Sequence, residues 1–306
     1  MRGSGVRTSA LGLTAAAVCG LVLLAGCQSD AGDATASPTP SATPVKGPLS
    51  IMLVNDDGWD APGITALYDA LRKQGHRVTI VAPLENQSGR SMATGSEPLR
   101  VTRPEGDEPK YAVDGTPVDS LNIGLLGVLK DDRPDIVVSG VNTGANVAEN
   151  TNYSGTVGAA AAAAEQGLPA LAVSADVGGP TGAGDYADAA DIVVDLVEEL
   201  AEQGFAGLGS KGFVNVNVPF ETATRSEPRG LRVAPIATAP PRTVEYAETE
   251  PGTWTPTFAY DGRAGSAEAD ASLLADGWTT LTFLPVARTA VAEGQRQLED
   301  LVDAQD

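Results

Sequence analysis

The sequence is poor in the side chains that most often carry nucleophilic or zinc chemistry. It contains one histidine, His76, and two cysteines, Cys19 and Cys27. We expect His76 to be structural, because it lies in a Gly-His-Arg turn between an expected helix and an expected strand. This excludes Ser-His-Asp and Cys-His catalysis and histidine-rich zinc sites. Any metal ion must then be held by oxygen ligands, which favours magnesium, manganese or calcium.

The chain also lacks an apolar run of the about 20 residues that a transmembrane helix needs. Its start combines Arg2 and Arg7 with a shorter apolar stretch, and small residues then lead to Cys27. This pattern predicts a signal peptide over residues 1–26. It resembles a bacterial lipoprotein signal, in which the cysteine is lipidated and becomes the mature N-terminus. An uncleaved anchor and an ordinary secretory signal are the alternatives.

Lipid on Cys27 would anchor the protein in the cell membrane, facing outward from the cytoplasm. Cys19 would be removed with the signal, so the mature chain would have neither a free thiol nor a disulfide. Residues 27–48 are mainly Ser, Ala, Thr, Pro, Asp and Gly, which predicts a flexible tether. The folded part is then residues 49–306, a length that suits one large α/β domain.

Positive charge is scarce as well. The chain has 20 Lys and Arg residues against 40 Asp and Glu residues, and its formal net charge is −20. Such a chain disfavours nucleic-acid polymers and anionic lipid as partners. A phosphate substrate would require local reversal of this charge by a metal ion and backbone amides. We expect most of the acids only to keep the surface soluble.

What the chain does contain is an alternation of strand and helix patterns. β-branched strands separated by helices predict a parallel-sheet α/β sandwich, covered on both faces, over a core of about residues 49–220. Right-handed crossovers then bring the strand ends to one edge. Strands are expected at 50–54, 77–82, 135–139, 169–174 and 213–218, and helices at 62–74, 117–130, 154–166 and 185–203.

Smaller elements are expected outside this alternation. A short β pair is expected at 99–102 and 111–113, between the second and third strands of the core. Residues 221–306 form an extension, in which the short alternating runs of 228–260 predict a β excursion from the main sheet. The extension is expected to continue with a short helix at 268–275, a strand at 278–284 and a final helix at 290–302.

The most informative motif follows the first strand. The apolar run 51–54 ends in Asn55, Asp56, Asp57 and Gly58. Ligands of α/β proteins bind at the carboxyl ends of parallel strands. Burying two adjacent carboxylates there is unfavourable unless a positive charge lies between them. A divalent metal ion is the simplest candidate.

Two further loops rich in oxygen ligands are expected at the same edge, at 85–91 and 140–146. Each is short, polar and punctuated by glycine, as backbone close to a ligand requires. Beyond them, Ser154 can cap a helix whose first amides are free to bind phosphate. Each loop alone is compatible with an ordinary turn. Together they predict a metal ion beside an anion site, and hence phosphoryl transfer to water.

These motifs, in this order, resemble the SurE survival-protein family of metal-dependent nucleotidases. The resemblance is close over residues 49–219 and loose over the remainder. The matching motifs are N-D-D-G-x-x-A-P-G at 55–63, V-A-P-x-x-x-x-S-G at 81–89, G-T-P-x-D at 115–119, P-D-x-V-V-S-G-x-N-x-G-x-N at 134–146 and Y-S-G-T-V at 153–157.

The resemblance implies a site and an activity. One divalent ion per subunit, magnesium or manganese with calcium as an alternative, would be held by Asp56, Asp57, Ser88 and Asn142, with the two aspartates also catalytic. Family members hydrolyse nucleoside 5′- and 3′-monophosphates, and some cut short polyphosphate. The phosphate side would be lined by Asn86, Asn146, Ser154, Gly155 and Thr156.

The resemblance also implies a Rossmann-like core with a β-rich extension. A C-terminal arm that exchanges between subunits would give a homodimer or a homotetramer. The chain departs from the family pattern at Ser120, where cysteine is usual, and in the segments 90–94 and 148–150. Segment 90–94 is expected to line the substrate pocket, so the base preference stays open. A lipoprotein signal is unusual for this family and suggests nucleotide scavenging at the cell surface.

The residues leave two other functions as alternatives. A surface lipoprotein that binds nucleotide or metal without turnover would not need adjacent aspartates together with a helix-start anion site. A phosphatase of the haloacid-dehalogenase type would need an Asp-x-Asp motif at the strand end, whereas Asp56 and Asp57 are adjacent. Attack by water and attack by an aspartate are both compatible with this pair.

Overall fold

The computed structural model describes residues 43–104, 106, 108–176, 186–209, 211–219, 228–238, 242–260 and 265–287. The chain divides into two compact units, Met1–Pro40 and Ser41–Asp306, and every described residue lies in the second. The expected signal peptide, Cys27 and the expected final helix at 290–302 lie outside the described residues. Within them, no helix is both long and apolar enough to cross a membrane.

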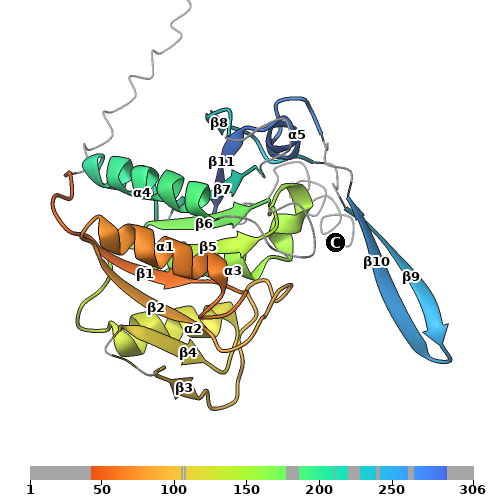
Figure 1. Ribbon diagram of the computed structural model, residues 1–306, viewed down its shortest axis with the longest axis horizontal. Helices are drawn as coiled ribbons and strands as arrows, with labels where there is room; N and C mark the ends of the chain where they lie inside the picture. The colour runs from red at the N-terminus through yellow and green to blue at the C-terminus, as the bar shows by residue number, and fades with distance from the viewer. Residues whose placement is uncertain are drawn as a thin grey trace, which may run out of the picture. The chain divides into compact units, whose positions relative to one another are not determined.

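The described strands of the core form one nine-stranded sheet in the order β3-β4-β2-β1-β5-β6-β7-β11-β8 (Figure 1). The central strands pair in parallel, whereas β3 and β11 run antiparallel to their neighbours β4 and β7. The strands are β1 Ser50–Val54, β2 Arg77–Pro83, β3 Val101–Thr102, β4 Lys110–Val113, β5 Ile136–Thr143, β6 Ala170–Ala175, β7 Gly212–Val218, β8 Leu231–Val233 and β11 Thr279–Pro285.

Helices cover both faces of this sheet, which confirms the expected α/β sandwich. Helices α1 and α4 pack on one face, and α2 and α3 pack on the other (Figure 1). A short helix, α5, lies beside β11. The helices are α1 Pro62–Lys73, α2 Pro117–Ile123, α3 Gly155–Glu165, α4 Ala187–Glu202 and α5 Asp270–Ala275.

Strand β1 shows why the sheet is buried on both sides. Ile51 and Leu53 belong to the core under α1 and α4, whereas Met52 and Val54 belong to the core under α2 and α3. Successive side chains of a strand point to opposite faces. An uninterrupted apolar run therefore fits only a strand that is covered twice. The polar residues begin where this cover ends, at Asn55.

Several elements differ from the sequence expectations in extent. The helix expected at 117–130 is α-helical only to Ile123 and continues as a π-helical turn over Gly124–Val128. Strand β5 runs on to Thr143, because its end pairs again with β6 after an irregularity between Ser139 and Asn142. A 3₁₀ helix at Ala148–Asn152 was not expected.

His76 is structural, as expected. It lies between α1 and β2, at the edge of the sheet where β1 begins, and its Nδ1 accepts the backbone N–H of Leu49 at 3.2 Å. Its Nε2 lies 3.6 Å from a carboxylate oxygen of Glu198 on α4. The histidine thus fastens the entry of the chain into β1 and takes no part at the opposite edge.

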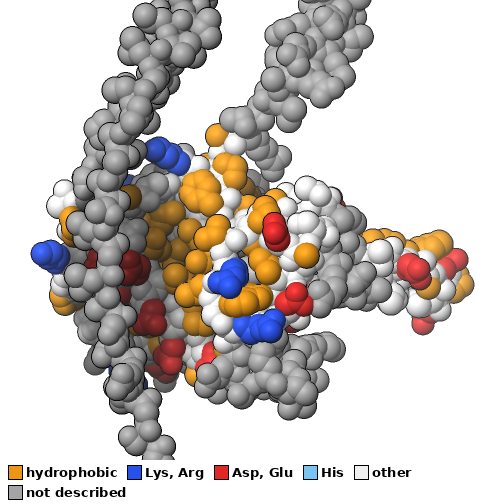
Figure 2. All heavy atoms as spheres, turned by 90° about the horizontal axis from the view of Figure 1, so that it is seen from above, with side chains coloured by type: hydrophobic (Ala, Val, Ile, Leu, Met, Phe, Trp, Pro, Cys, Tyr) orange, Lys and Arg blue, Asp and Glu red, His pale blue; other side chains and the backbone are white. Residues whose placement is uncertain are grey.

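The β excursion expected at 228–260 is only partly confirmed: β8 joins the main sheet beside β11, whereas the later part of the segment forms a hairpin that stands apart from the sheet. Strands β9 Arg242–Glu250 and β10 Thr253–Tyr260 pair only with each other among the described strands and project away from the sheet (Figure 1). Tyr246 and Trp254 lie on one face, 61% and 60% exposed. Figure 2 shows both apolar and acidic side chains on the surface of this projection. A two-stranded ribbon with a bare apolar face is marginally stable alone and indicates a contact surface.

Candidate metal and phosphate site

The three polar loops meet at the carboxyl ends of β1, β2 and β5, as expected. The backbone N–H of Gln87 donates to the backbone oxygen of Asp56 at 2.7 Å. The amide of Asn86 donates to Oδ1 of Asp57 at 3.1 Å, and the backbone N–H of Thr143 donates to Oδ2 of Asp57 at 2.9 Å. The two adjacent aspartates are therefore the point on which the loops converge.

Asp56 is the buried member of the pair, with only 3% of its surface exposed. The hydroxyl of Thr156 donates to its Oδ1 at 2.6 Å. Burial raises the pKa of Asp56 to about 6; the Thr156 hydroxyl lowers it, and the neighbouring charge of Asp57 raises it. The site thus makes the charged form of Asp56 unfavourable, and a nearby cation would stabilise that form.

Asp57 is half-buried and faces the loops after β2 and β5. Burial raises its pKa, while hydrogen bonds from Thr143 and Asn86 lower it. Among the described residues, the ion pairs of Lys, Arg and His are made with other acids. Two acids with raised pKa values that form no ion pair with a described Lys, Arg or His are the arrangement that a bound metal ion explains.

Neutral oxygens have to complete such a metal site. No group of three or more His, Cys, Asp and Glu side chains suited to a metal occurs within the described ranges. The amide nitrogen of Asn142 donates to the carbonyl of Gly144 at 2.7 Å, so its amide oxygen is the atom left for a ligand. Carboxylate, amide and hydroxyl oxygens are the donors that magnesium and manganese prefer.

The backbone of β5 aims Asn142. The ladder to β6 breaks after Ser139 and resumes with Asn142 opposite Ser174. Gly140 occupies the break with φ of +140°, and a Cβ there would lie 2.3 Å from the carbonyl oxygen of Val173. Only glycine fits this position. Breaks of this kind redirect side chains beside functional sites.

Asn86 connects Asp57 to Ser88. Its nitrogen donates to Asp57, and its oxygen accepts the backbone N–H of Ser88 at 2.9 Å, which forms a local turn. Ser88 is exposed at this turn. The structure therefore brings Asn86 and Ser88 to the aspartate pair, and their assignment to phosphate and to metal stays a prediction.

The start of α3 lies directly against Asp56. Ser154 caps the helix, its Oγ accepting the N–H of Val157 at 3.2 Å. A Cβ on Gly155 would lie 2.8 Å from Cβ and 2.9 Å from Oδ2 of Asp56. Glycine is thus what allows the helix N-terminus to approach a carboxylate so closely. The first amides of α3, which favour negative charge, are placed at the same edge as the acids.

Asn146 is fixed within the sheet. Its side-chain amide donates to Ser174 Oγ at 2.8 Å, and its backbone N–H donates to Asn217 Oδ1 at 2.7 Å. Its carbonyl accepts from the side chains of Asn215 and Asn217. The predicted contact of Asn146 with phosphate stays a prediction. Sequence reasoning missed the anchoring role of Asn215 and Asn217, although two buried asparagines in an apolar strand were a visible signal.

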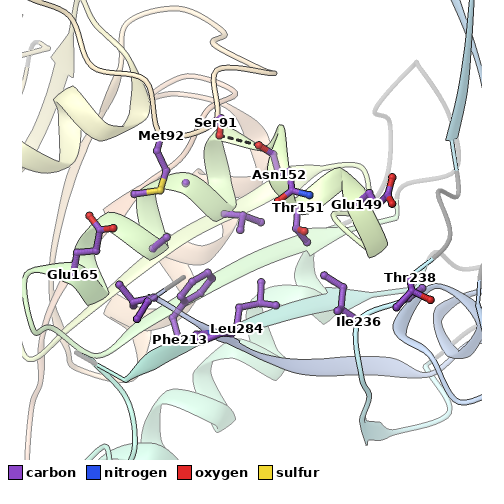
Figure 3. A pocket seen from close by; sticks show the side chains of 17 residues that line it. Ser91, Met92, Glu149, Thr151, Asn152, Glu165, Phe213, Ile236, Thr238 and Leu284 are labelled. Carbon is purple, nitrogen blue, oxygen red and sulfur yellow. Dashed lines mark hydrogen bonds between the residues drawn. The ribbon is translucent and has the colours of Figure 1, made fainter. Parts of the chain in front are cut away.

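At two of the positions that depart from the family pattern, the structure shows which hydrogen bonds the side chains form. The hydroxyl of Ser120 is buried and donates to the carbonyl of Thr116 within α2. Ser91, in the segment 90–94, donates through its N–H to the carbonyl of Tyr153 at 3.1 Å. Its hydroxyl donates to the carbonyl of Asn152 at 2.8 Å (Figure 3). The segment is thereby fastened to the chain that leads into α3.

A groove of about 930 Å³ runs along the other side of this segment. Figure 3 shows Phe213, Leu284 and Ile236 on one side of it and Met92 on the other. Neither aspartate lines it. The groove is therefore a hollow beside α3 and distinct from the acid pair, with which it shares only the surrounding elements.

Comparison with known proteins gives a consistent family. The matching family model is described as Survival protein SurE and covers residues 51–242. A 5′-nucleotidase SurE of Desulfovibrio desulfuricans is 39% identical over 246 residues, which are 77% of this chain and 92% of that protein. One of Desulfatibacillum aliphaticivorans is 46% identical over 175 residues, which are 56% of this chain and 66% of that protein. The chain thus spans about two thirds of some curated relatives and nearly all of others.

A solved structure agrees with the sequence relatives. The crystal structure of the SurE protein from Aquifex aeolicus superposes with a TM-score of 0.68 and shares 31% sequence identity. The match covers 82% of this chain and 99% of that chain. The similarity therefore extends over the core and into the extension.

The buried charge of Asp56 predicts a pH-dependent stability of the metal-free protein. The pKa of Asp56 rises from 3.8 to about 6 on folding. The contribution of Asp56 to the free energy of unfolding is therefore most favourable below pH 3.8 and is lost as the pH rises through about 6. The loss is on the order of 3 kcal/mol. Asp56→Asn should therefore stabilise the protein at pH 8 and leave it unchanged at pH 4, measured by urea unfolding in EDTA. Asp69→Asn, at an exposed position on α1, is the control. A destabilised Asp56→Asn protein at pH 8 would contradict the assignment.

The contact of Gly155 with Asp56 predicts a loss of metal binding in Gly155→Ala. The added methyl group would displace either the helix start or the carboxylate, at a cost of about 1–3 kcal/mol. We expect a much smaller rise in melting temperature on adding manganese than in the unmodified protein. Gly127→Ala is the matched control, since a Cβ at Gly127 meets nothing within 4 Å. Equal manganese responses of the two variants would show that the close approach is unimportant.

Proposed function

The chain belongs to the SurE family, and from that membership we propose that it is a metal-dependent phosphomonoesterase that hydrolyses nucleoside 5′-monophosphates. The relatives named above as 5′-nucleotidases support this activity. The single observation that carries it is the pair Asp56–Asp57 at the end of β1, with the N-terminus of α3 placed against it. This arrangement provides for a cation and for phosphate oxygens within one small volume.

The residues that would hold the metal ion are Asp56, Asp57, Ser88 and Asn142. They offer hard oxygen donors, which fit magnesium or manganese, one ion per subunit. The raised pKa values of both acids support this assignment, because a divalent ion would neutralise the buried charge. When bound, such an ion supplies Lewis-acid polarisation of a phosphoryl oxygen.

The protein groups around the ion would orient the phosphate and move the proton. The amides of Gly155 and Thr156 would neutralise phosphoryl oxygens, with Ser154 holding the helix start in place. Asp57 is the more accessible acid, and we assign proton transfer to it. Asp56 is held by Thr156 and fixes the geometry of the pair. Asn86 and Asn146 would complete the phosphate side.

We propose further that lipid on Cys27 anchors the protein at the outer face of the cell membrane, where it releases nucleosides from extracellular nucleotides. The signal-like N-terminus supports this location. In the described part of the chain, Val45 donates its N–H to the carbonyl of Ala201 at 2.9 Å, and the chain then enters β1 at Ser50. The tether therefore joins the sheet at the edge opposite Asp56 and Asp57.

The activity predicts metal-dependent release of phosphate by residues 41–306, which form one compact unit. The protein is incubated with 5′- and 3′-nucleoside monophosphates in manganese, in magnesium and in EDTA, and inorganic phosphate is measured. We expect release with 5′-monophosphates and a divalent ion, and none in EDTA. Binding of nucleotide without release, by protein shown to be folded, would support a capture protein instead.

Loss of the proton-transfer acid should abolish turnover without unfolding the protein. Asp57→Asn is expected to lower kcat by about 10²–10⁴-fold. The circular dichroism spectrum should stay unchanged, because Asp57 is half-buried and its replacement keeps the side-chain size. Asp69→Asn on α1 is again the matched control. Activity of Asp57→Asn within a few-fold of the unmodified protein would remove Asp57 from the mechanism.

The bare face of the hairpin supports a homodimer or homotetramer, in which a second copy covers Tyr246 and Trp254. Trp254→Glu should then reduce the mass measured by light scattering at micromolar concentration. The matched control is Thr255→Glu, which adds the same charge to the other face of β10. An unchanged mass in Trp254→Glu would show that this face does not hold the subunits together.

A further inference from the structure

Asp270 is a fully buried carboxylate far from the acid pair in sequence. It is the first residue of α5 and has 0% of its surface exposed. Its Oδ2 accepts the N–H of Ala148 at 3.0 Å, and its Oδ1 accepts the N–H groups of Ala237 and Ala271, each at 2.8 Å. Within the described part of the chain, none of the ion pairs involves Asp270. The described groups that donate to this carboxylate are backbone N–H groups, which stabilise its charge.

These amides come from three separate segments. Ala237 precedes the β9–β10 hairpin, Ala271 follows it, and Ala148 lies 122 residues from Asp270 at the start of the 3₁₀ helix. One carboxylate therefore closes the base of the hairpin and fastens it to the loop between β5 and α3. Small apolar side chains surround the junction and keep water out: Val147, Ala148, Ala237, Ala269, Ala271 and Leu274.

The contact holds an unfavourable backbone conformation. Ala148 has φ of +51°, a region that residues with a Cβ rarely adopt. Its N–H points at the buried carboxylate, and its carbonyl accepts the hydroxyl of Thr151 at 2.8 Å. If the carboxylate of Asp270 did not accept this N–H, the positive-φ conformation of Ala148 would be unfavourable, and the loop would adopt another conformation.

The loop 143–155, which contains Ala148, contacts the acid pair at both of its ends. Thr143 donates its N–H to Asp57 at 2.9 Å, and Gly155 lies against Asp56. Asn146 anchors the chain just before Ala148, so a displacement at Ala148 is transmitted chiefly through residues 148–155 to Gly155 and Asp56. We propose that Asp270 is a positioning residue for hydrolysis, which acts through Ala148 and the loop 143–155. This proposal rests on the proposed function.

The test begins with Asp270→Asn. Asparagine keeps the size of the side chain, but its NH₂ group would face a backbone N–H donor and lose one of the three contacts. We expect kcat to fall by about tenfold or more, since small misplacements of reacting groups have effects of this size, with KM changed by less than about threefold. The matched control is Glu268→Gln, an exposed acid two residues away, which should leave kcat unchanged.

A rescue separates positioning from general destabilisation. Glycine adopts positive φ without strain, so Ala148→Gly added to Asp270→Asn should restore most of the lost kcat. Failure of the rescue, or a kcat of Asp270→Asn equal to that of Glu268→Gln in folded protein, would overturn the proposal. If Asp270→Asn does not fold, Asp270→Glu is measured in its place with the same expectations.

An activity-independent measurement keeps the two proposals apart. Amide hydrogen exchange of residues 143–153 should be faster in Asp270→Asn than in the unmodified protein, with exchange in β1 and α1 unchanged. If the unmodified protein released no phosphate, the proposed function would fail. The catalytic part of the proposal would fail with it, and exchange would test the structural part alone: faster exchange, reversed by Ala148→Gly, supports Asp270 as the anchor of the loop, and unchanged exchange overturns that as well.

Discussion

The structure depends on two carboxylates placed side by side where a buried strand ends. Burial of this pair is unfavourable by itself, and the elements around it each reduce the penalty. Thr156 donates to Asp56, while Asn86 and the backbone of Thr143 donate to Asp57. The N-terminus of α3 adds its partial positive charge. The remaining charge is what makes the site suited to a cation and, through it, to a phosphate ester.

Buried carboxylates also hold the loops around the pair in place, by accepting backbone N–H groups. Asp119, buried in the first turn of α2, accepts the N–H of Gly95 at 3.1 Å and so fixes the far end of the loop that carries Ser88. Asp270 does the same for the loop after β5 by accepting the N–H of Ala148. A carboxylate is well suited to this task, because it accepts several amide protons at once and leaves each loop one conformation.

Much of this could be predicted from the sequence because it is local. The uninterrupted apolar run of β1 followed by Asp56 and Asp57 predicts a buried strand with acids at its end, and Ser154 predicts the start of α3. The break in β5 could not be predicted, since it depends on the approach of Val173 to Gly140. The hydrogen bond from the N–H of Ala148 to Asp270 also joins distant residues, and neither residue alone carries a pattern that points to the other.

The sequence of the β9–β10 hairpin reduces its tendency to aggregate. A ribbon of two strands has two open edges and one apolar face, and such surfaces stack on one another in crowded solution. Glu248 lies directly opposite Trp254 in the register, so a negative charge interrupts the apolar stripe. Pro256, opposite Tyr246, removes one backbone donor from the outer edge. The ribbon can thus recognise a shaped and charged partner surface while it resists assembly into fibres.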